Sequence, residues 1–258
     1  MTSIGSSIRI VQLYPELLGV TGDTGNVDVL ATRARLAGIE VQTETVSVGA
    51  ALTAAPDILV IGNGPASAVR AVHADLIARA DQLRACVDDG TVVLAVGGGA
   101  ELLTEGITFL DGSTLEGLSM IPATVHRTRE RRVGYIVAEN PDADLIGFED
   151  HASSWRISAD APTEIRYARV IGGHGSIDAE DGARYETARV GQIYASNVQG
   201  PVLPLNPRFA DALLSAAVQR SGGSYQTTSA HHELDLHAEA ARAAIRKLAS
   251  KQYTVIAL

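Results

Sequence analysis

Cysteine is almost missing from this sequence: Cys86 is the only one among 258 residues, so no disulfide can form within the chain. Such cysteine usage fits a reducing compartment, and we expect a cytoplasmic protein. No apolar run approaches the roughly 20 residues of a membrane-spanning helix, so we expect no membrane span. Aromatic residues make up 4% of the chain, and its net charge is −9. Because phosphate binding needs positive charge and base stacking needs rings, we expect no nucleic-acid partner.

What is present is an alternation of strand and helix patterns up to about residue 105. Apolar positions at helical spacing predict one helix from Asn26 to Gly38 and one long helix from Val69 to Gly90. This alternation predicts an α/β fold, in which a mostly parallel sheet is covered by helices on both faces. The expected strands are Ile8–Tyr14, Ile39–Val46, Asp57–Ile61 and Val92–Val96.

Three glycine-rich turns follow the first, third and fourth of these strands. They lie near Gly22, Gly62 and Gly97. Ligands bind beyond the carboxyl ends of the strands in such sheets. We therefore expect the three turns to line one rim of the sheet.

The pattern changes after Gly106, where short extended runs are separated by polar or glycine-rich loops. This change predicts an antiparallel or mixed extension of the sheet, followed by a helix that Asn206 caps and Pro207 begins. We expect residues 1–220 to form one domain. Residues 221–258 would supply a linker, an amphipathic helix (Leu234–Leu248) and a tail (Tyr253–Leu258) that pack on the domain or on a partner. The extended runs are Met120–Thr128, Arg132–Ala138, Ile165–Ile171 and Gln192–Val198.

The stretch Thr91–Leu103, with the sequence TVVLAVGGGAELL, predicts a strand that ends in a tight turn and leads directly into a helix. α/β enzymes place a nucleophile on such a bend, where the next N–H faces the developing oxyanion. The residue on this bend is Gly97, which has no side chain. A phosphate-binding turn is the alternative, but the stretch has neither the lysine of a P-loop nor a G-x-G-x-x-G pattern, so we expect no cofactor.

Several blocks between Leu13 and Leu214 together resemble the GatD subunits of lipid II isoglutaminyl synthase, which are class I glutamine amidotransferases of the cobyric-acid-synthase (CobB/CobQ) type. The resemblance implies a flavodoxin-like α/β sheet. It also implies glutamine hydrolysis that supplies ammonia to a Mur-ligase-like partner, MurT, which amidates the D-glutamate of the peptidoglycan precursor. The blocks include LYPELLGVTGDTGN, DILVIGNGP, LAVGGGAELL, LIGFEDH, GGHGSIDAEDGARY and QGPVLPLNPRF.

The catalytic pair implied by the resemblance is missing. The family has Cys-Gly-Gly where this chain has Gly97-Gly98-Gly99, and His-Gly-Pro where it has Gln199-Gly200-Pro201. Glycine supplies no nucleophile and the amide of glutamine does not titrate near neutral pH, so neither can do glutaminase chemistry.

The frame of the substrate pocket is retained by the same comparison. Gly98 keeps the oxyanion-binding position at the head of the helix, and Gly62 and Gly64 flank a second expected contributor. Between them stands Asn63, where the family usually has glycine. Arg131 matches the arginine that is expected to hold the glutamine substrate.

Other candidate residues receive structural interpretations. We expect Cys86 to be a buried thiol, and Arg127 and Arg129 to lie on a solvated edge strand. For Arg131 a solvated edge position stays open beside the role in binding a carboxylate. His151 and His174 are expected to hold loops together. No cysteine or close carboxylate accompanies the last group of histidines, so we expect surface residues and no metal site. This group is His231, His232 and His237.

Three hypotheses for the function follow. The first is a non-hydrolytic partner of a MurT-like ligase that takes free ammonia or another amine. The second is a glutaminase subunit altered at its catalytic pair, by engineering or by relocation of the chemistry. The third is a small-molecule sensor that binds glutamine or a nucleotide in the retained pocket.

Overall fold

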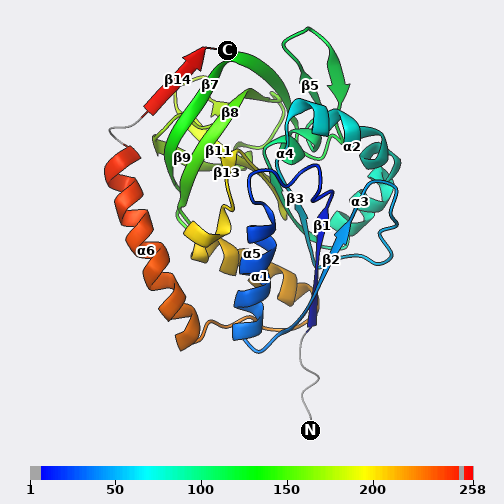
Figure 1. Ribbon diagram of the computed structural model, residues 1–258, viewed down its shortest axis with the longest axis vertical. Coiled ribbons are helices and arrows are strands. Elements are labelled where there is room, and N and C mark those ends of the chain that lie inside the picture. Colours follow the sequence, from blue (N-terminus) through cyan, green and yellow to red (C-terminus); the bar gives the residue numbers. More distant parts are fainter. Residues whose placement is uncertain (1–6, 250–252, 258) are drawn as a thin grey trace.

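The computed structural model describes residues 7–249 and 253–257, and these form an α/β structure around one large sheet (Figure 1). The last residue of the predicted tail, Leu258, lies outside the described residues. The strand order in the sheet is β2-β1-β3-β4-β12-β11-β10-β8-β7-β5-β6. Within the described part of the chain, no helix is long and apolar enough to cross a membrane.

One half of the sheet is parallel, as the sequence predicts. Neighbouring strands here pair in parallel throughout, and β3 and β4 are buried along their whole length because helices cover both faces. The strands in spatial order are β2 (Glu40–Val46), β1 (Ser7–Leu13), β3 (Ile58–Ile61), β4 (Val92–Val96) and β12 (Ile193–Ser196).

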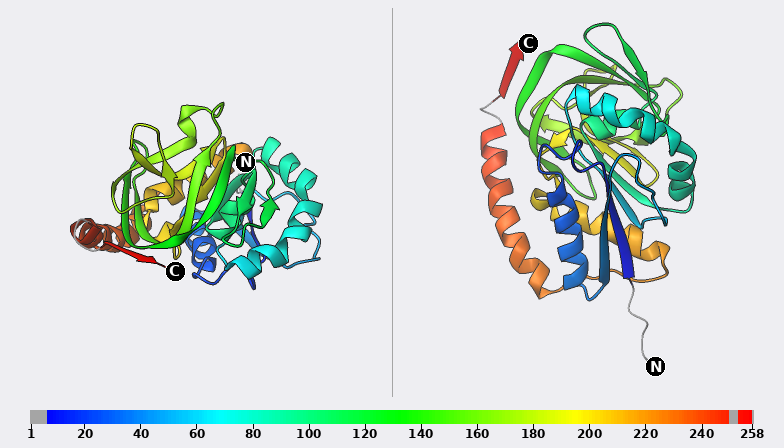
Figure 2. Two further views of the ribbon diagram at one scale, coloured as in Figure 1. Left: turned by 90° about the horizontal axis from the view of Figure 1, so that it is seen from above. Right: turned by 45° about the vertical axis from the view of Figure 1, so that its right-hand side comes forward.

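The two faces of this half carry separate hydrophobic cores. Along β4, Val93 and Ala95 belong to one core, whereas Val92, Leu94 and Val96 belong to the other, because successive side chains of a strand point to opposite faces. The first core packs against α2 (Ala66–Ala78), α3 (Ala80–Asp88) and α4 (Gly98–Leu102). The second packs against α1 (Thr24–Leu36) and α5 (Pro207–Arg220) (Figures 1 and 2). The flavodoxin-like prediction is confirmed.

The other half of the sheet is mostly antiparallel, which confirms the predicted extension. The predicted runs Met120–Thr128, apart from its first three residues, and Arg132–Ala138 belong to one long strand, β7, whose register shifts between Arg127 and Arg132. The strands are β5 (Gly106–Thr108), β6 (Thr114–Glu116), β7 (Ala123–Glu139), β8 (Leu145–Ile157), β9 (Arg166–Gly172), β10 (Ile177–Asp178), β11 (Arg184–Val190) and β13 (Val198–Gln199). Two short 3-10 turns are η1 (Thr163–Ile165) and η2 (Leu203–Leu205).

Two predictions about the helices are wrong. The single helix from Val69 to Gly90 is divided into α2 and α3 at Arg79, whose guanidinium pairs with Asp75 at 2.5 Å and donates to the carbonyl of Ala50 at 3.1 Å. Asn206 precedes α5, but its side chain does not cap that helix. It instead accepts from the amide of Ile146 at 2.8 Å and donates to the carbonyls of Ile146 and Val202.

The C-terminal segment packs on the rest of the chain. Helix α6 (Ser229–Ala249) runs beside α1, and strand β14 (Tyr253–Ala257) pairs antiparallel with β7 (Figure 2). Arg33 of α1 is 4% exposed and joins α5 to α6, because it contacts Asp211 at 2.7 Å and Asp235 at 2.6 Å.

We predict that Arg33→Leu weakens the docking of α6 and lowers the free energy of unfolding by about 3 kcal/mol, because two partly buried carboxylates lose their cation. Urea denaturation measures the change. Arg35→Leu is the matched control, since Arg35 is exposed on the same helix. Equal effects of the two substitutions would contradict the assigned role of Arg33.

Candidate functional site

A cavity of about 760 Å³ opens at the carboxyl ends of β3 and β4. Its walls come from the turns after these strands, from the loop between β1 and α1, and from β7, β8 and β13. The expectation that the three glycine-rich turns share one rim is confirmed by tight contacts. A Cβ at Gly62 would touch Asp23 at 2.6 Å, and one at Gly25 would touch Pro201 at 2.7 Å. The cavity lies where ligands bind in open α/β sheets.

The turn after β4 has the geometry of a nucleophile-bearing bend. Gly97 has φ +52° and ψ −119°, a backbone conformation that costs a residue with a side chain about 1–3 kcal/mol. Its N–H donates to the carbonyl of Ser196 at 2.8 Å, and its carbonyl accepts from Glu101 at 2.9 Å. The bend is thus fixed by β12 on one side and by α4 on the other.

Asn63 occupies the space that a side chain at position 97 would need. A Cβ built on Gly97 would lie 2.1 Å from Asn63 Oδ1 and 2.4 Å from its Cγ. The same Oδ1 accepts the N–H of Gly98 at 2.9 Å. The N–H that the resemblance assigns to oxyanion binding is therefore already bonded within the chain.

Gly62 and Gly64, on either side of Asn63, lie against the backbone of the loop after β1. A Cβ at Gly62 would come within 2.1 Å of the carbonyl oxygen of Leu18, and one at Gly64 within 2.5 Å of that of Leu17. Only glycine fits such close approaches. The loop that carries Asn63 is consequently held in place from both sides.

Gln199 lines the same cavity as Gly97, so the two predicted catalytic positions are brought together. Gln199 lies on β13, opposite Phe148 of β8, and is 8% exposed. Among the described residues, no hydrogen bond to its carboxamide is found. This amide is free to contact a ligand.

Both arginines of β7 that line the cavity are paired. Arg131 holds Asp150 with two hydrogen bonds, Nε to Oδ1 at 2.5 Å and Nη2 to Oδ2 at 2.9 Å. Arg127 contacts the buried carboxylate of Glu101 at 2.6 Å. The predicted solvated edge is thus wrong for Arg127, because β7 lies inside the sheet and its side chain turns toward α4. Arg129 lies on the same strand, and its predicted exposure to solvent is confirmed.

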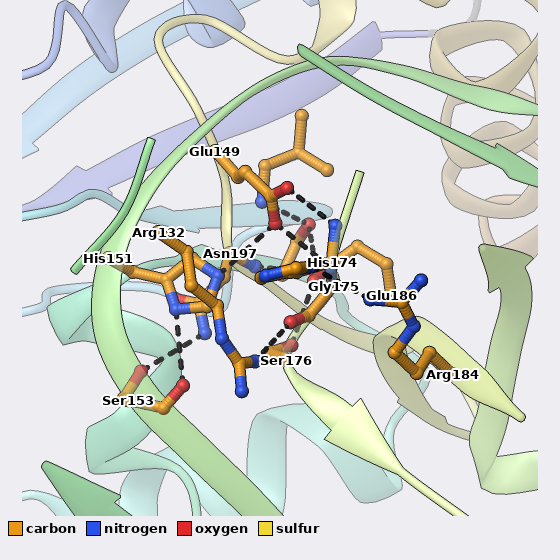
Figure 3. A network of polar contacts seen from close by, with 12 residues as sticks. Arg132, Glu149, His151, Ser153, His174, Gly175, Ser176, Arg184, Glu186 and Asn197 are labelled. Carbon is orange, nitrogen blue, oxygen red and sulfur yellow. Dashed lines mark hydrogen bonds and ion pairs between the residues drawn. The ribbon is translucent and has the colours of Figure 1, made fainter. Parts of the chain in front are cut away.

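Behind the cavity wall lies a buried polar network, drawn in Figure 3, which the sequence analysis did not identify. Glu149 is fully buried and accepts the N–H groups of His174 at 2.7 Å and of Gly175 at 2.9 Å, while His151 Nε2 lies 3.5 Å away. Burial by itself raises the pKa of Glu149, but these donors outweigh burial and lower the pKa below its usual value. The carboxylate therefore fixes the loop after β9 to β8.

A second buried carboxylate, Glu186, organises the neighbouring strand ends. It accepts the N–H of Thr187 at 2.8 Å, the N–H of Asn197 at 2.7 Å and the hydroxyl of Ser176 at 2.8 Å. Repeated alternation of polar residues along β8 and β11 is the signal that could have identified these interior strands.

The histidines differ in their surroundings. His174 holds a loop as predicted, since its N–H reaches Glu149 and its Nδ1 lies 2.8 Å from Arg184 Nη1. His151 is 5% exposed and lines the cavity. The prediction of a surface position is wrong for His231, which is buried with Nε2 2.8 Å from the carbonyl of Arg33. His232 and His237 are exposed.

Two further predictions concern the sulfur and metal chemistry of the chain. Cys86 is buried, and burial raises the pKa of its thiol, so the predicted inert cysteine is confirmed. Over the described ranges 7–249 and 253–257, no cluster of three or more histidine, cysteine or acidic residues could hold a metal ion.

The comparisons with known proteins agree on a family. The family model of the CobB/CobQ-like glutamine amidotransferase domain matches residues 9–207. The lipid II isoglutaminyl synthase (glutamine-hydrolyzing) subunit GatD of Streptococcus pneumoniae (strain ATCC BAA-255 / R6) is 28% identical over 220 residues, which cover 84% of this chain and 82% of that protein. The subunit of the same name from Staphylococcus aureus (strain N315) is 26% identical over 234 residues, which cover 90% and 93%.

Solved structures show the same fold. A crystal structure of a glutamine amidotransferase matches with a TM-score of 0.53 and 18% identity, covering 80% of this chain and 98% of that one. The structure of PurLQS from Thermotoga maritima matches with a TM-score of 0.50 and 11% identity, covering 84% and 97%.

We predict that His174 makes stability depend on pH between about 6.5 and 4. Burial, together with Arg132 and Arg184, lowers the pKa of His174 to about 4, although Glu149 opposes this. Between these pH values the unfolded chain binds more protons than the folded one, so stability falls as the pH falls. Urea denaturation across this range should show a flatter dependence for His174→Asn than for the wild type. An unchanged slope, equal to that of the exposed control His232→Asn, would contradict the assignment.

Proposed function

Because this chain belongs to the CobB/CobQ-like glutamine amidotransferase family, we propose that it is the amidotransferase-type subunit of a two-component amide ligase in the cytoplasm. The GatD relatives, named as subunits of lipid II isoglutaminyl synthase, support lipid II as the acceptor. The partner is a MurT-like Mur ligase that amidates D-glutamate and forms a heterodimer with this chain. Residues 1–220 supply the amidotransferase-like domain, and residues 221–258 pack on it or on the partner.

In this proposal the subunit does not hydrolyse glutamine. The observation that carries it is the position of Asn63, whose carboxamide fills the nucleophile space beside Gly97 and bonds the N–H of Gly98. Amide hydrolysis needs a nucleophile, a base and a free oxyanion donor. Gly97 and Gln199 lack the first two, and Asn63 takes the third. By analogy with a serine protease, loss of the nucleophile alone lowers turnover on the order of 10⁶-fold.

The same observation bears on the alternative of an active glutaminase disabled by a single engineered change. Removal of one cysteine from a working site would leave the space beside position 97 open. Here Asn63 already fills it, and Gln199 replaces the base as well. The three changes support a site long adapted to the absence of hydrolysis, and the role of the subunit is to stabilise or regulate the ligase.

A glutamine sensor is the second candidate, favoured by the retained cavity of about 760 Å³. The argument against a sensor concerns Arg131, the arginine expected to hold glutamine. Its Nε and Nη2 groups already donate hydrogen bonds to Asp150. Binding of a substrate carboxylate there requires this pair to open.

We predict that ammonia release from glutamine by the wild type stays at the background level, and that Gly97→Cys with Gln199→His does not restore it, because the new Cβ meets Asn63. Adding Asn63→Gly to these two changes should raise ammonia release at least tenfold, since the space and the Gly98 N–H become free. An enzymatic rate in the wild type would overturn the proposal.

Stability offers an independent measure of the contact between positions 63 and 97. Gly97→Cys alone should lower the free energy of unfolding by about 1–3 kcal/mol, because the backbone has positive φ there. In a double-mutant cycle, the loss should be smaller in the Asn63→Gly background. Additive effects would show that the two positions do not interact.

We predict that the purified complex with the ligase amidates its acceptor with ammonium salts and not with glutamine. The measurement is product formation with each nitrogen source. The Arg131→Ala variant is measured alongside the wild type to test whether glutamine acts from the cavity. Glutamine-dependent amidation that Arg131→Ala abolishes would instead favour the second hypothesis, and calorimetric glutamine binding without turnover would favour the sensor.

A further inference from the structure

The inner wall of the cavity, between α4 and β8, carries polar atoms that the fold leaves without hydrogen bonds. They are Glu101 Oε2, Arg127 Nε, His151 Nε2 and Asn197 Oδ1, and all four residues line the cavity. Glu101 is 2% exposed and Asn197 is 1% exposed. Glu101 Oε2 lies 2.6 Å from Arg127, and His151 Nε2 lies 3.5 Å from Glu149. Asn197 Oδ1 is therefore the buried acceptor in this wall that has no partner among the described residues, and an unsatisfied acceptor at such depth in a cavity points to a ligand.

Ser153 of β8 brings three of these residues into one subsite. Its hydroxyl accepts from Asn197 Nδ2 at 3.5 Å and bonds Glu101, and its carbonyl lies 3.2 Å from His151 Nδ1. Figure 3 shows the side chains of His151 and Asn197 next to Ser153. Since Asn197 follows Ser196, whose carbonyl binds Gly97, the subsite adjoins the former nucleophile position.

The fold holds Asn197 in place at a cost. Its N–H and that of Thr187 share Glu186 Oε1 as acceptor, at 2.7 Å and 2.8 Å. Thr187 has φ +67°, which is rare for a β-branched residue and is maintained where function demands it. The asparagine side chain donates to Ser153, and its Oδ1 is left for a ligand.

The free atoms of the subsite indicate what the ligand must bring. Asn197 Oδ1 can only accept a hydrogen bond. Glu101 Oε2 is paired with Arg127 at 2.6 Å, so it has only its remaining lone pair for a ligand, and Gln199 offers a further amide oxygen. A ligand group with several N–H donors satisfies such acceptors, and a protonated amine has up to four. The charge of Glu101 is paired with that of Arg127, so a cation in the subsite would be held by the oxygens of Asn197, Gln199 and Glu101 and not by an unpaired negative charge.

We propose that Glu101, Asn197 and Gln199 form a binding site for the protonated amino group of a small amine, with ammonium as the smallest member of the class. The inference rests on the proposed function, because it identifies where the nitrogen source of a non-hydrolysing subunit first binds. The carboxamide of glutamine cannot take the oxyanion position, since Asn63 already bonds Gly98 there. The site thus accepts an amine that arrives from solution.

The test is the thermal unfolding midpoint of the full chain titrated with ammonium chloride at constant ionic strength. Tetramethylammonium chloride is the control, because it has the same charge and no N–H donor. Ammonium should raise the midpoint in a saturable way in the millimolar range, and tetramethylammonium should not. Equal responses to the two cations would overturn the proposal.

Variants locate the effect within the cavity. Asn197→Leu should weaken the response to ammonium at least tenfold, Asn197→Asp should preserve it because the acceptor remains, and Glu101→Gln should weaken it. Glu180→Gln is the matched control, because Glu180 is exposed and lies outside the cavity lining, and this variant should respond as the wild type does. A full response in Asn197→Leu and Glu101→Gln would show that ammonium acts elsewhere and would overturn the site.

Failure of this inference is distinguishable from failure of the proposed function. If the chain ignores ammonium and also leaves glutamine intact, only the amine site is wrong, and ordered water satisfies the free acceptors. If the chain hydrolyses glutamine, the proposed function is wrong whatever the response to ammonium.

Discussion

The hydrogen bond from the N–H of Gly98 to Asn63 Oδ1 is the contact on which the character of this cavity depends. It joins the ends of two adjacent parallel strands, and it forms only because position 97 has no side chain. The glycine also removes the strain that positive φ imposes on other residues. The Asn63 amide therefore fills the space beside Gly97 and also satisfies the N–H of Gly98.

The scaffold around this contact is fixed by buried polar interactions. Two fully buried carboxylates, Glu149 and Glu186, hold the strand ends of the antiparallel half through backbone N–H donors. Because each carboxylate is satisfied by several donors, its burial does not leave an uncompensated charge. A hydrophobic core does not need buried carboxylates with several donors each. Their presence in the cavity wall suits a site that binds a ligand.

The parallel half of the sheet could be predicted from sequence because its strands are short, apolar and bounded by glycine turns. Strand β8 could not, because its inward-facing polar residues, such as Glu149 and Ser153, resemble those of a loop. The contact of Asn63 with Gly97 could not be predicted from the sequence either. It joins two turns that are 34 positions apart, and only the packing of the fold shows that they touch. His231 was misplaced for a similar reason: nothing local to α6 reveals that α1 covers it.

The tight packing of Asn63 against the bend couples positions 63 and 97. A cysteine introduced at position 97 meets the amide of Asn63, and a glycine introduced at position 63 leaves a void beside Gly97. A change at one of the two positions therefore alters the space that is open to the other. Residues 63 and 97 are expected to vary as a pair, so the identity of one restricts which side chains the other can carry.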